Sequence, residues 1–215
     1  SGGDSHNWRV WHGYHPPAEY RYDRAAFASE FGLQAPPNAA TLRRFIPEAE
    51  QWPPGPSWAH HGANLQKLHR YAAPFLDEDP SLEAFVLASQ RAQAHGLQTA
   101  IEHYRRRKAQ NCGGVLVWQL NEPWPAISWA LLDYYRQPKP GYEVVKRLFR
   151  PVLVCVEYPL LEYRTGDSFR GDVWILNDTA EQLAGCKLEV ALEDETGSAL
   201  RRLMQRLDVP ADSAE

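Results

Sequence analysis

Apolar residues recur along the first 150 positions at two spacings, one typical of strands and one typical of helices. Residues 27–33 (FASEFGL) predict a strand, and the uniformly apolar residues 115–118 (VLVW) predict a buried strand of the kind found in parallel sheets. Three helices are expected between them: a short one over about 39–45, one over about 63–74 and a longer one that begins at Asp79-Pro80. The order strand, helical crossover, strand indicates an α/β protein with a parallel sheet.

The two longer helices carry an apolar face, and capping residues and charges mark where helices begin and end. Asn38 is a suitable N-cap for a helix over about 39–45, and Asp79 or Ser81 can cap the long helix. Residues 105–108 (RRRK) complement the dipole at its end, and we expect them to be solvated. The expected apolar faces comprise Leu65, Leu68, Ala72 and Phe75 in the helix at 63–74 and Phe85, Ala88, Ala92, Ile101 and Tyr104 in the long helix.

Three further stretches of the first 150 residues have distinct patterns. Residues 1–26 lack periodicity and contain glycine and proline, which predicts a long, ordered loop. Residues 52–62 contain WPPGP and are expected to be irregular. A last helix is expected at about 140–149.

The pattern changes at Pro151, which predicts a domain boundary between residues 1–150 and 151–215. Apolar runs at 152–156, 169–176 and 187–192 predict strands, separated by turns at 165–167, 177–178 and 196–197. Alternation in the third run, at Leu188, Val190 and Leu192, is typical of a half-buried antiparallel sheet. We expect a second domain of the sandwich type.

Composition and charge narrow the function classes. The net charge of −4 over 215 residues gives no sign of a nucleic-acid partner, and no apolar run approaches the roughly 20 residues that cross a bilayer. Three cysteines are too few for a disulfide framework, and they favour buried thiols and an intracellular compartment. The chain opens with SGG rather than Met, which suggests a piece of a longer protein.

The chain is rich in aromatic residues, with eight Trp, ten Tyr and seven Phe beside eight His. Aromatic faces stack on the C–H faces of sugar rings, but they also pack in ordinary cores. Composition alone leaves both roles open.

Glu30 is the first candidate for chemistry. It follows the start of the predicted strand 27–33 and precedes Gly32, where the backbone can turn. A carboxylate at the carboxyl end of such a strand is where barrel enzymes place catalytic groups, although a glutamate in a surface loop has the same appearance.

Two further motifs change the interpretation of Glu30. Residues 3–13 (GDSHNWRVWHG) are dense in Trp and His, and residues 113–129 read GGVLVWQLNEPWPAISW. Together with 27–34 (FASEFGLQ), these segments resemble the β-mannosidase branch of glycoside hydrolase family 2, in the same order and at similar spacing. The resemblance runs from about Gly3 to Pro151.

The resemblance implies a fold and a reaction. It implies the C-terminal half of a (β/α)₈ TIM barrel followed by a partial immunoglobulin-like β-sandwich. It also implies a retaining exo-β-glycosidase that acts on terminal β-mannosides, with Glu30 as nucleophile and with no cofactor. The acid/base of the family lies upstream of the nucleophile, before this chain begins, so this chain by itself is expected to be inactive.

The same resemblance suggests residues that contact the sugar. Trp118 matches the tryptophan that forms the floor under the bound sugar, often beside a non-proline cis peptide. Trp8, His12, Asp4 and His6 match a loop that flanks the nucleophile; Asn7 stands there in place of the usual aromatic, which could alter sugar selectivity. Trp124 and Trp129 are candidates for a cleft wall or for packing.

Glu122 is a tempting second carboxylate, because a retaining glycosidase needs two carboxyl groups about 5–5.5 Å apart. It follows the predicted strand 115–118 and lies downstream of Glu30, whereas the family's acid/base lies upstream. We therefore expect Glu122 to lie on the substrate side or in a structural loop.

Other functions stay open at this point. The same motifs occur in enzymes acting on β-glucosaminides or β-galactosides, and an inactive barrel could be a carbohydrate-binding protein. A purely structural fragment is a third reading, in which another chain completes the barrel, because half a barrel leaves sheet edges unpaired. Adjacent Asp4, Ser5 and His6 have the wrong geometry for a hydrolase triad, and the neighbouring His60 and His61 lack the spacing of metal ligands.

Overall fold

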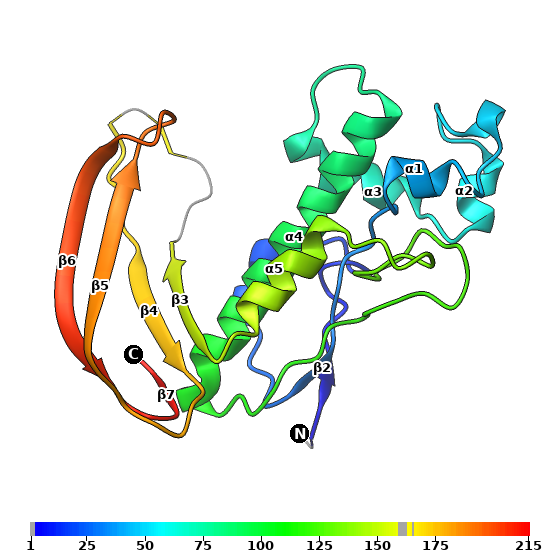
Figure 1. Cartoon of the computed structure of the whole chain (residues 1–215). Helices are drawn as coiled ribbons and strands as arrows, with labels where there is room; N and C mark the ends of the chain where they lie inside the picture. The colour runs from blue at the N-terminus through cyan, green and yellow to red at the C-terminus, as the bar shows by residue number, and fades with distance from the viewer. Residues whose placement is uncertain (1–2, 159–162, 165) are drawn as a thin grey trace. The chain divides into compact units, whose positions relative to one another are not determined.

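The chain forms a mixed α/β structure with two compact units (Figure 1). The computed structural model describes residues 3–158, 163–164 and 166–215. The first unit extends to Phe149 and contains the helices, and the second begins at Arg150 and consists of strands.

Three parallel backbone segments form the centre of the first unit. β1 (Ser5–His6) pairs in parallel with β2 (Ala28–Glu30). Ala28 also forms a parallel bridge with Val115, so β2 lies between β1 and the segment 113–118. The amide of Leu116 donates to the carbonyl of Ala28 at 2.8 Å. The parallel arrangement expected from the strand–helix–strand order is therefore confirmed.

These segments are shorter and more exposed than the sequence predicted. β2 covers three residues of the expected 27–33, and residues 115–118 form an isolated bridge rather than a regular strand. Leu116 is 53% exposed, so the expectation of a buried strand is wrong. Among the described residues, this segment bridges to β2 along one of its two edges, and its other edge has no bridge. An apolar run at such an edge stays accessible.

Five helices surround this centre in the described part of the first unit, together with short 3₁₀ turns. The predicted helices near 63–74 and 140–149 and the predicted long helix are confirmed. Ser81, rather than Asp79, caps the long helix by accepting a hydrogen bond from the amide of Ala84. The helix at 39–45 is shorter than expected, and the stretches expected to be irregular contain β1, a 3₁₀ turn and α2. The helices are α1 (Ala39–Leu42), α2 (Pro56–His60), α3 (Leu65–Ala72), α4 (Leu82–Arg106) and α5 (Pro140–Leu148), and the 3₁₀ turns are Pro17–Tyr22, Glu48–Glu50, Ala73–Phe75 and Arg107–Gln110.

The long helix α4 supplies nine buried apolar side chains to the core of the first unit and runs beside α5 (Figure 1). Its predicted apolar face is buried along its whole length, whereas in α3 Leu68 and Ala72 are buried and Phe75 is 39% exposed. Gly96 faces Leu33 so closely that a Cβ atom there would lie 2.5 Å from its Cδ1. The helix also buries several polar side chains, among them Gln90 and Gln93, which the apolar pattern did not predict.

The basic run that ends α4 is buried, so the expectation of a solvated helix end is wrong. Arg105, Arg106 and Arg107 are each less than 10% exposed. Arg105 donates to the carbonyl of Leu148, and Arg107 Nη1 lies 3.1 Å from the carbonyls of both Asp23 and Ala25. Arginine can be buried here because its guanidinium carries five donors that satisfy backbone carbonyls of the neighbouring segments.

The second unit contains antiparallel strands, as expected. β3 (Val152–Glu157), β4 (Asp172–Asn177) and β7 (Ser213–Ala214) form one sheet, and β5 (Leu183–Glu193) and β6 (Ala199–Val209) form a hairpin around the turn at 196–197. β6 and β7 were not predicted. The predicted turn at 165–167 includes residue 165, which lies outside the described residues.

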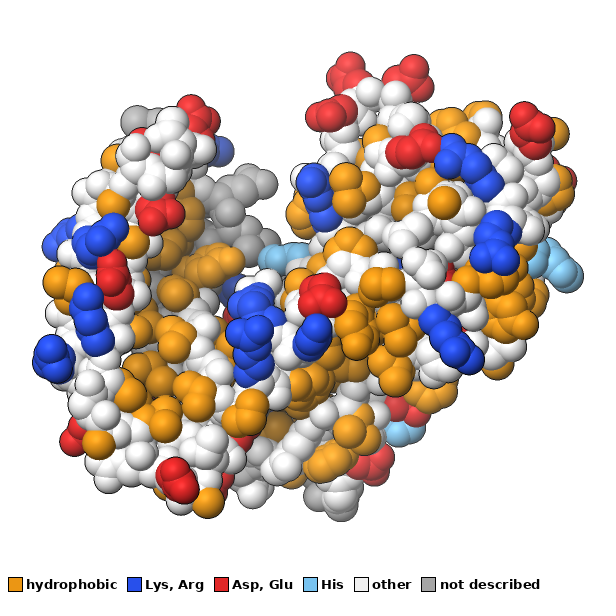
Figure 2. Space-filling view, in the orientation of Figure 1, with side chains coloured by type: hydrophobic (Ala, Val, Ile, Leu, Met, Phe, Trp, Pro, Cys, Tyr) orange, Lys and Arg blue, Asp and Glu red, His pale blue; other side chains and the backbone are white. Residues whose placement is uncertain are grey.

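Side chains of the second unit leave apolar surface accessible. Leu192, Leu200, Leu203 and Met204 of the β5–β6 hairpin are each at least half exposed. Figure 2 shows orange side chains over the strands of this unit. The three cysteines are free thiols, and Cys155 is buried in β3 as expected. In the described ranges, no helix has the length and apolar character needed to cross a membrane.

The residues just after β2 approach the segment 113–118 closely, which generates a first prediction. A Cβ atom on Gly32 would lie 2.2 Å from the carbonyl oxygen of Trp118, a backbone atom that cannot move away alone. Gly32→Ala should therefore lower the free energy of unfolding by about 1–3 kcal/mol, the usual effect of overpacking. Denaturant unfolding followed by tryptophan fluorescence measures the change.

Gly113→Ala is the matched control, because its Cβ atom would meet Ala26 at an ordinary 3.7 Å. Equal stability of the Gly32→Ala and Gly113→Ala proteins would contradict the close contact.

Candidate active site

Glu30 is the last residue of β2, and two side chains from the preceding segment converge on one of its oxygens. The indole Nε1–H of Trp8 donates to Oε2 of Glu30 at 3.1 Å, and Nδ1 of His6 lies 3.4 Å from the same atom. The amide of Asn7 donates to the backbone carbonyl of Glu30 at 2.8 Å, which continues the pairing of β1 with β2. The carboxylate of Glu30 is thus half-buried and oriented by donors from one neighbouring segment.

Asp4 lies on the other side of His6. Its Oδ2 is 3.5 Å from Nε2 of His6 and accepts a hydrogen bond from the Ser29 hydroxyl at 2.6 Å. The Ser29 hydrogen bond holds the pKa of Asp4 below its usual value. The His6 ring therefore lies between two carboxylates, Asp4 and Glu30.

An aromatic cluster supports the Trp8 ring. Trp129 meets Trp8 edge-on at 6.0 Å between ring centroids and also contacts Trp11 and His12. His12 lies 5.0 Å from Trp8. Burial, and to a smaller extent the charge of Lys67, lowers the pKa of His12, which favours a neutral ring at pH 7. Trp8 and His12, both expected near Glu30, are therefore in contact with each other.

Trp118 joins this group through its backbone. Its amide donates to the carbonyl of Phe31, the residue after Glu30, at 3.0 Å, and its side chain is 41% exposed. The peptide bond between Trp118 and Gln119 is cis.

Trp124 lies in a different side-chain cluster. Its ring stacks on His61 at 5.2 Å and meets His60 edge-on at 6.1 Å. None of its ring contacts among the described residues is with Trp8, His12 or Trp129.

Glu122 is buried, which favours the structural loop over the substrate side, the two places expected from the sequence. It is 8% exposed and is held near the ammonium of Lys139, and burial raises its pKa. Its Oε1 has no hydrogen-bond partner among the described groups. The side chain that looked like a second catalytic carboxylate belongs to the interior.

Lys139 is the centre of that buried group. Its Nζ donates to the carbonyls of Ala35 at 2.7 Å and Ser128 at 3.1 Å, and the carboxylates of Glu122 and Asp133 act on its charge. Burial lowers the pKa of Lys139 to about 7. Lys139 thus ties the chain after Glu30 to the loop that carries Trp129, and sequence reasoning missed it because nothing in a Pro-Lys-Pro triplet distinguishes a buried lysine from an exposed one.

Asn7 is also an interior residue. Its side-chain amide donates to the Asp23 carboxylate and to the Tyr104 hydroxyl, and the residue is 7% exposed. The position where the related family usually has an aromatic residue is therefore a polar contact with α4.

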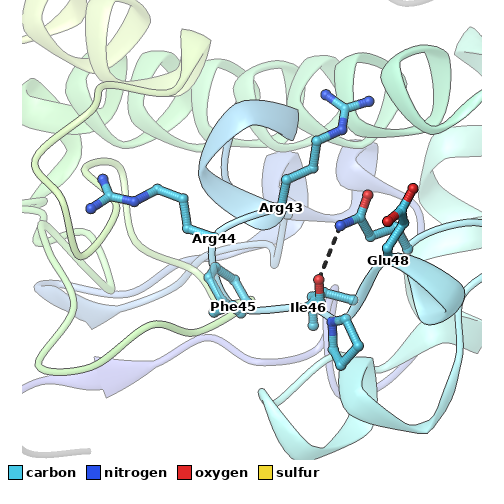
Figure 3. A pocket seen from close by; sticks show the side chains of 7 residues that line it. Arg43, Arg44, Phe45, Ile46 and Glu48 are labelled. Carbon is cyan, nitrogen blue, oxygen red and sulfur yellow. Dashed lines mark hydrogen bonds between the residues drawn. The ribbon is translucent and has the colours of Figure 1, made fainter.

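The structure also contains an open pocket of about 560 Å³ at the end of α1, which Figure 3 shows from close by. Arg43 and Arg44 extend from it in opposite directions (Figure 3). Arg43 pairs with Glu83, and Arg44 lies over the Tyr135 ring at 3.4 Å. Both cations are therefore already engaged, and the pocket carries no catalytic constellation.

A metal centre is not part of the described arrangement. In residues 3–158, 163–164 and 166–215, no group of three or more His, Cys, Asp or Glu side chains is placed to hold a metal ion.

A carboxylate at the carboxyl end of a parallel strand is where barrel enzymes place catalytic groups, and the sequence resemblance names a glycosidase. Comparisons with known proteins agree. The chain is 30% identical over 221 residues to β-mannosidase B of Aspergillus niger and 29% identical to that of Aspergillus terreus, in both cases over 96% of this chain and 26% of the relative. No family model matches the sequence.

Solved structures give the same result. The β-D-mannosidase of Dictyoglomus thermophilum is 35% identical, with a TM-score of 0.84 over 99% of this chain and 26% of that one. The exo-chitosanase of Amycolatopsis orientalis, at 22% identity and a TM-score of 0.70 over 94% of this chain and 25% of that one, shares the fold.

The chain is therefore homologous, along nearly its whole length, to the β-mannosidase-like members of glycoside hydrolase family 2, which confirms the resemblance seen in the sequence. It spans about a quarter of the length of the relatives that it matches.

The buried lysine generates a second prediction. Lys139→Met leaves Glu122 and Asp133 without their cation, and removing one partner of a buried pair is worth roughly 3–5 kcal/mol of stability. We expect residues 119–138 to exchange amide hydrogens much faster in this variant, measured by hydrogen-exchange mass spectrometry. Adding Glu122→Gln should slow the exchange again, because one unpaired charge is removed.

Lys146→Met is the matched control, since Lys146 is an exposed lysine of α5 that forms a surface pair with Glu143. Exchange in residues 119–138 that is the same in all three proteins would refute the anchoring role of Lys139.

Proposed function

We propose that the polypeptide carrying this chain is a retaining exo-β-glycosidase that hydrolyses terminal β-mannosides, with Glu30 as the nucleophile. The observation that carries the proposal is the convergence of Trp8 and His6 on Oε2 of Glu30 at the end of β2. The β-mannosidase names of the relatives support the choice of sugar.

In this mechanism the Glu30 carboxylate attacks the anomeric carbon and forms a glycosyl ester, while the leaving oxygen takes a proton from a second carboxyl group. Water then hydrolyses the ester, and the second group acts as base. The Trp8 indole, His6 and the end of β2 hold Glu30 in the orientation for attack. Trp8, His12, Asp4, His6 and Trp118 line the sugar in this proposal.

Neither Asp4 nor Glu122 suits the second role. A general acid at neutral pH needs a raised pKa, whereas the Ser29 hydrogen bond lowers the pKa of Asp4. Glu122 has a raised pKa, but it is buried against Lys139. We therefore assign the acid/base to sequence outside this chain, upstream of Glu30, as in the related family.

The same proposal includes the architecture. Residues 1–150 would be the C-terminal part of a (β/α)₈ barrel, in which β1, β2 and residues 113–118 are successive parallel strands and α4 is a crossover helix. The accessible edge at Leu116 then receives a further strand. Residues 151–215 would be part of an immunoglobulin-like sandwich, whose second layer covers the apolar side chains of the β5–β6 hairpin.

Substitution of the nucleophile is the direct test. Glu30→Gln in the intact polypeptide should lower kcat on an aryl β-mannoside by at least about 10³-fold, because amide oxygen is a poor nucleophile. A 2-deoxy-2-fluoro-β-mannoside should label the wild-type protein, and peptide mass spectrometry should locate the label on Glu30.

Glu143→Gln, an exposed glutamate of α5, is the control and should keep full activity. Labelling of a residue other than Glu30 would overturn the assignment. A panel that includes β-glucosaminides and β-galactosides tests the sugar separately.

Trp8 provides an independent test of the geometry. Trp8→Phe keeps an aromatic ring but removes the N–H that donates to Glu30. A hydrogen bond to a charged group is worth about 1.5–3 kcal/mol, so kcat should fall roughly 10- to 100-fold. Trp174→Phe in β4 is the control, and an unchanged kcat in Trp8→Phe would mean that this hydrogen bond does not matter in the reaction.

A further inference from the structure

Trp124, His60 and His61 form an aromatic platform apart from the Glu30 group. Trp124 stacks on His61 with an interplanar angle of 23°, and His60 meets both rings edge-on. The ring of Phe45, which follows α1, packs against His61 with 4.6 Å between the ring centroids. Although His61 lies against its ring, Trp124 is 42% exposed.

Backbone hydrogen bonds fix this platform to the chain that follows Glu30. Nδ1 of His61 is 2.7 Å from the carbonyl of Pro125, and the amide of Ile127 donates to the carbonyl of His61 at 2.8 Å. Gln34, four residues after Glu30, donates to the carbonyl of Gly62 at 2.8 Å. The platform is therefore held by the same loops that extend from the candidate active site.

The loop that carries Trp124 also carries Trp129 of the cluster around Trp8. The two are five positions apart, so their Cα atoms lie within roughly 18 Å of each other. Ser128, between them, is anchored by Lys139. This short loop therefore connects the platform with the aromatic cluster whose Trp8 donates to Glu30.

The chemistry of the platform suits a pyranose. An indole with one face supported by an imidazole offers its other face to C–H groups. Because Nδ1 of His61 faces a carbonyl oxygen, it must be the protonated nitrogen, and in the neutral ring Nε2 is then an acceptor for a hydroxyl group. His60 is exposed beside it. Such a surface has both the apolar face and the polar edge that a sugar ring presents.

We propose that Trp124, His60 and His61 bind a second pyranose ring of a β-linked oligosaccharide, on the leaving-group side of the bond that Glu30 attacks. This inference rests on the proposed glycosidase function. It assigns to the platform a preference for chain length rather than a part in the bond cleavage.

Binding to the inactive Glu30→Gln form of the intact polypeptide tests the proposal without turnover. Titration calorimetry with β-1,4-mannotriose and with methyl β-mannoside measures the contribution of the further rings; the β-1,4-linked glucosamine trimer and its methyl glycoside replace them if the hydrolysis panel favours glucosaminides. Adding Trp124→Ala should raise the Kd of the trisaccharide by about 10-fold or more, because the aromatic face is lost, and leave the Kd of the methyl glycoside unchanged.

Tyr134→Ala is the matched control, because Tyr134 is a comparably exposed aromatic residue of the same loop that contacts Tyr135 instead. His61→Ala, which removes the support and the Nε2 acceptor, should reproduce the loss if Trp124→Ala does not fold. Equal losses for both ligands, or no loss for the trisaccharide, would overturn the platform. Failure of the proposed function itself is seen separately, as the absence of turnover on the aryl glycoside panel.

Discussion

Backbone carbonyl groups buried beside short strands need hydrogen-bond donors, and in the first unit many of these come from side chains. β1 has two residues and β2 three, so strand pairing satisfies only part of the backbone. Gln93 of α4 donates to the carbonyls of Leu33 and Trp129 at 2.8 and 3.0 Å. Lys139 and Arg107 serve other carbonyls in the same way.

The need to satisfy these carbonyl groups also fixes the backbone near the Trp8 and Trp129 rings. Leu33 follows Glu30 on the chain, and Trp129 contacts Trp8, whose indole donates to Glu30. Gln93 therefore joins the segment that carries Glu30 to the segment whose Trp129 contacts Trp8. Gln93 does not contact the sugar in the proposed mechanism, but it holds the backbone of segments that carry residues near Glu30. Such support from a second layer of residues is usual for preorganised sites.

One group of ionisable side chains in the first unit lies at Glu30, and another lies around Lys139. The ionisable groups nearest to Glu30 are His6 and, beyond it, Asp4, while the carboxylates of Glu122 and Asp133 are set against Lys139 in the interior. The two glutamates singled out in the sequence as candidate catalytic carboxylates, Glu30 and Glu122, thus have different environments. Burial separates them: one is half-exposed at a strand end and the other faces an ammonium group.

The sequence alone determined the parallel order of the central segments, the long helix α4 with its apolar face, the antiparallel strands after residue 151 and the family that the three motifs resemble. These features depend on local periodicity and on motifs, which a single chain displays directly. The clustering of Trp8, His6 and His12 also followed from motifs, and the role of Glu30 stays a prediction.

Only the tertiary structure decided which polar side chains are buried. From sequence, Arg105–Arg107, Asn7 and Glu122 are expected at the surface or in the site, and Lys139 is not singled out. In the structure each satisfies or faces a group brought near it by a distant segment. The stacking of Trp124 on His61 has the same origin, because 63 positions separate the two residues. Local sequence cannot report such contacts, since they depend on how the loops after the strands meet.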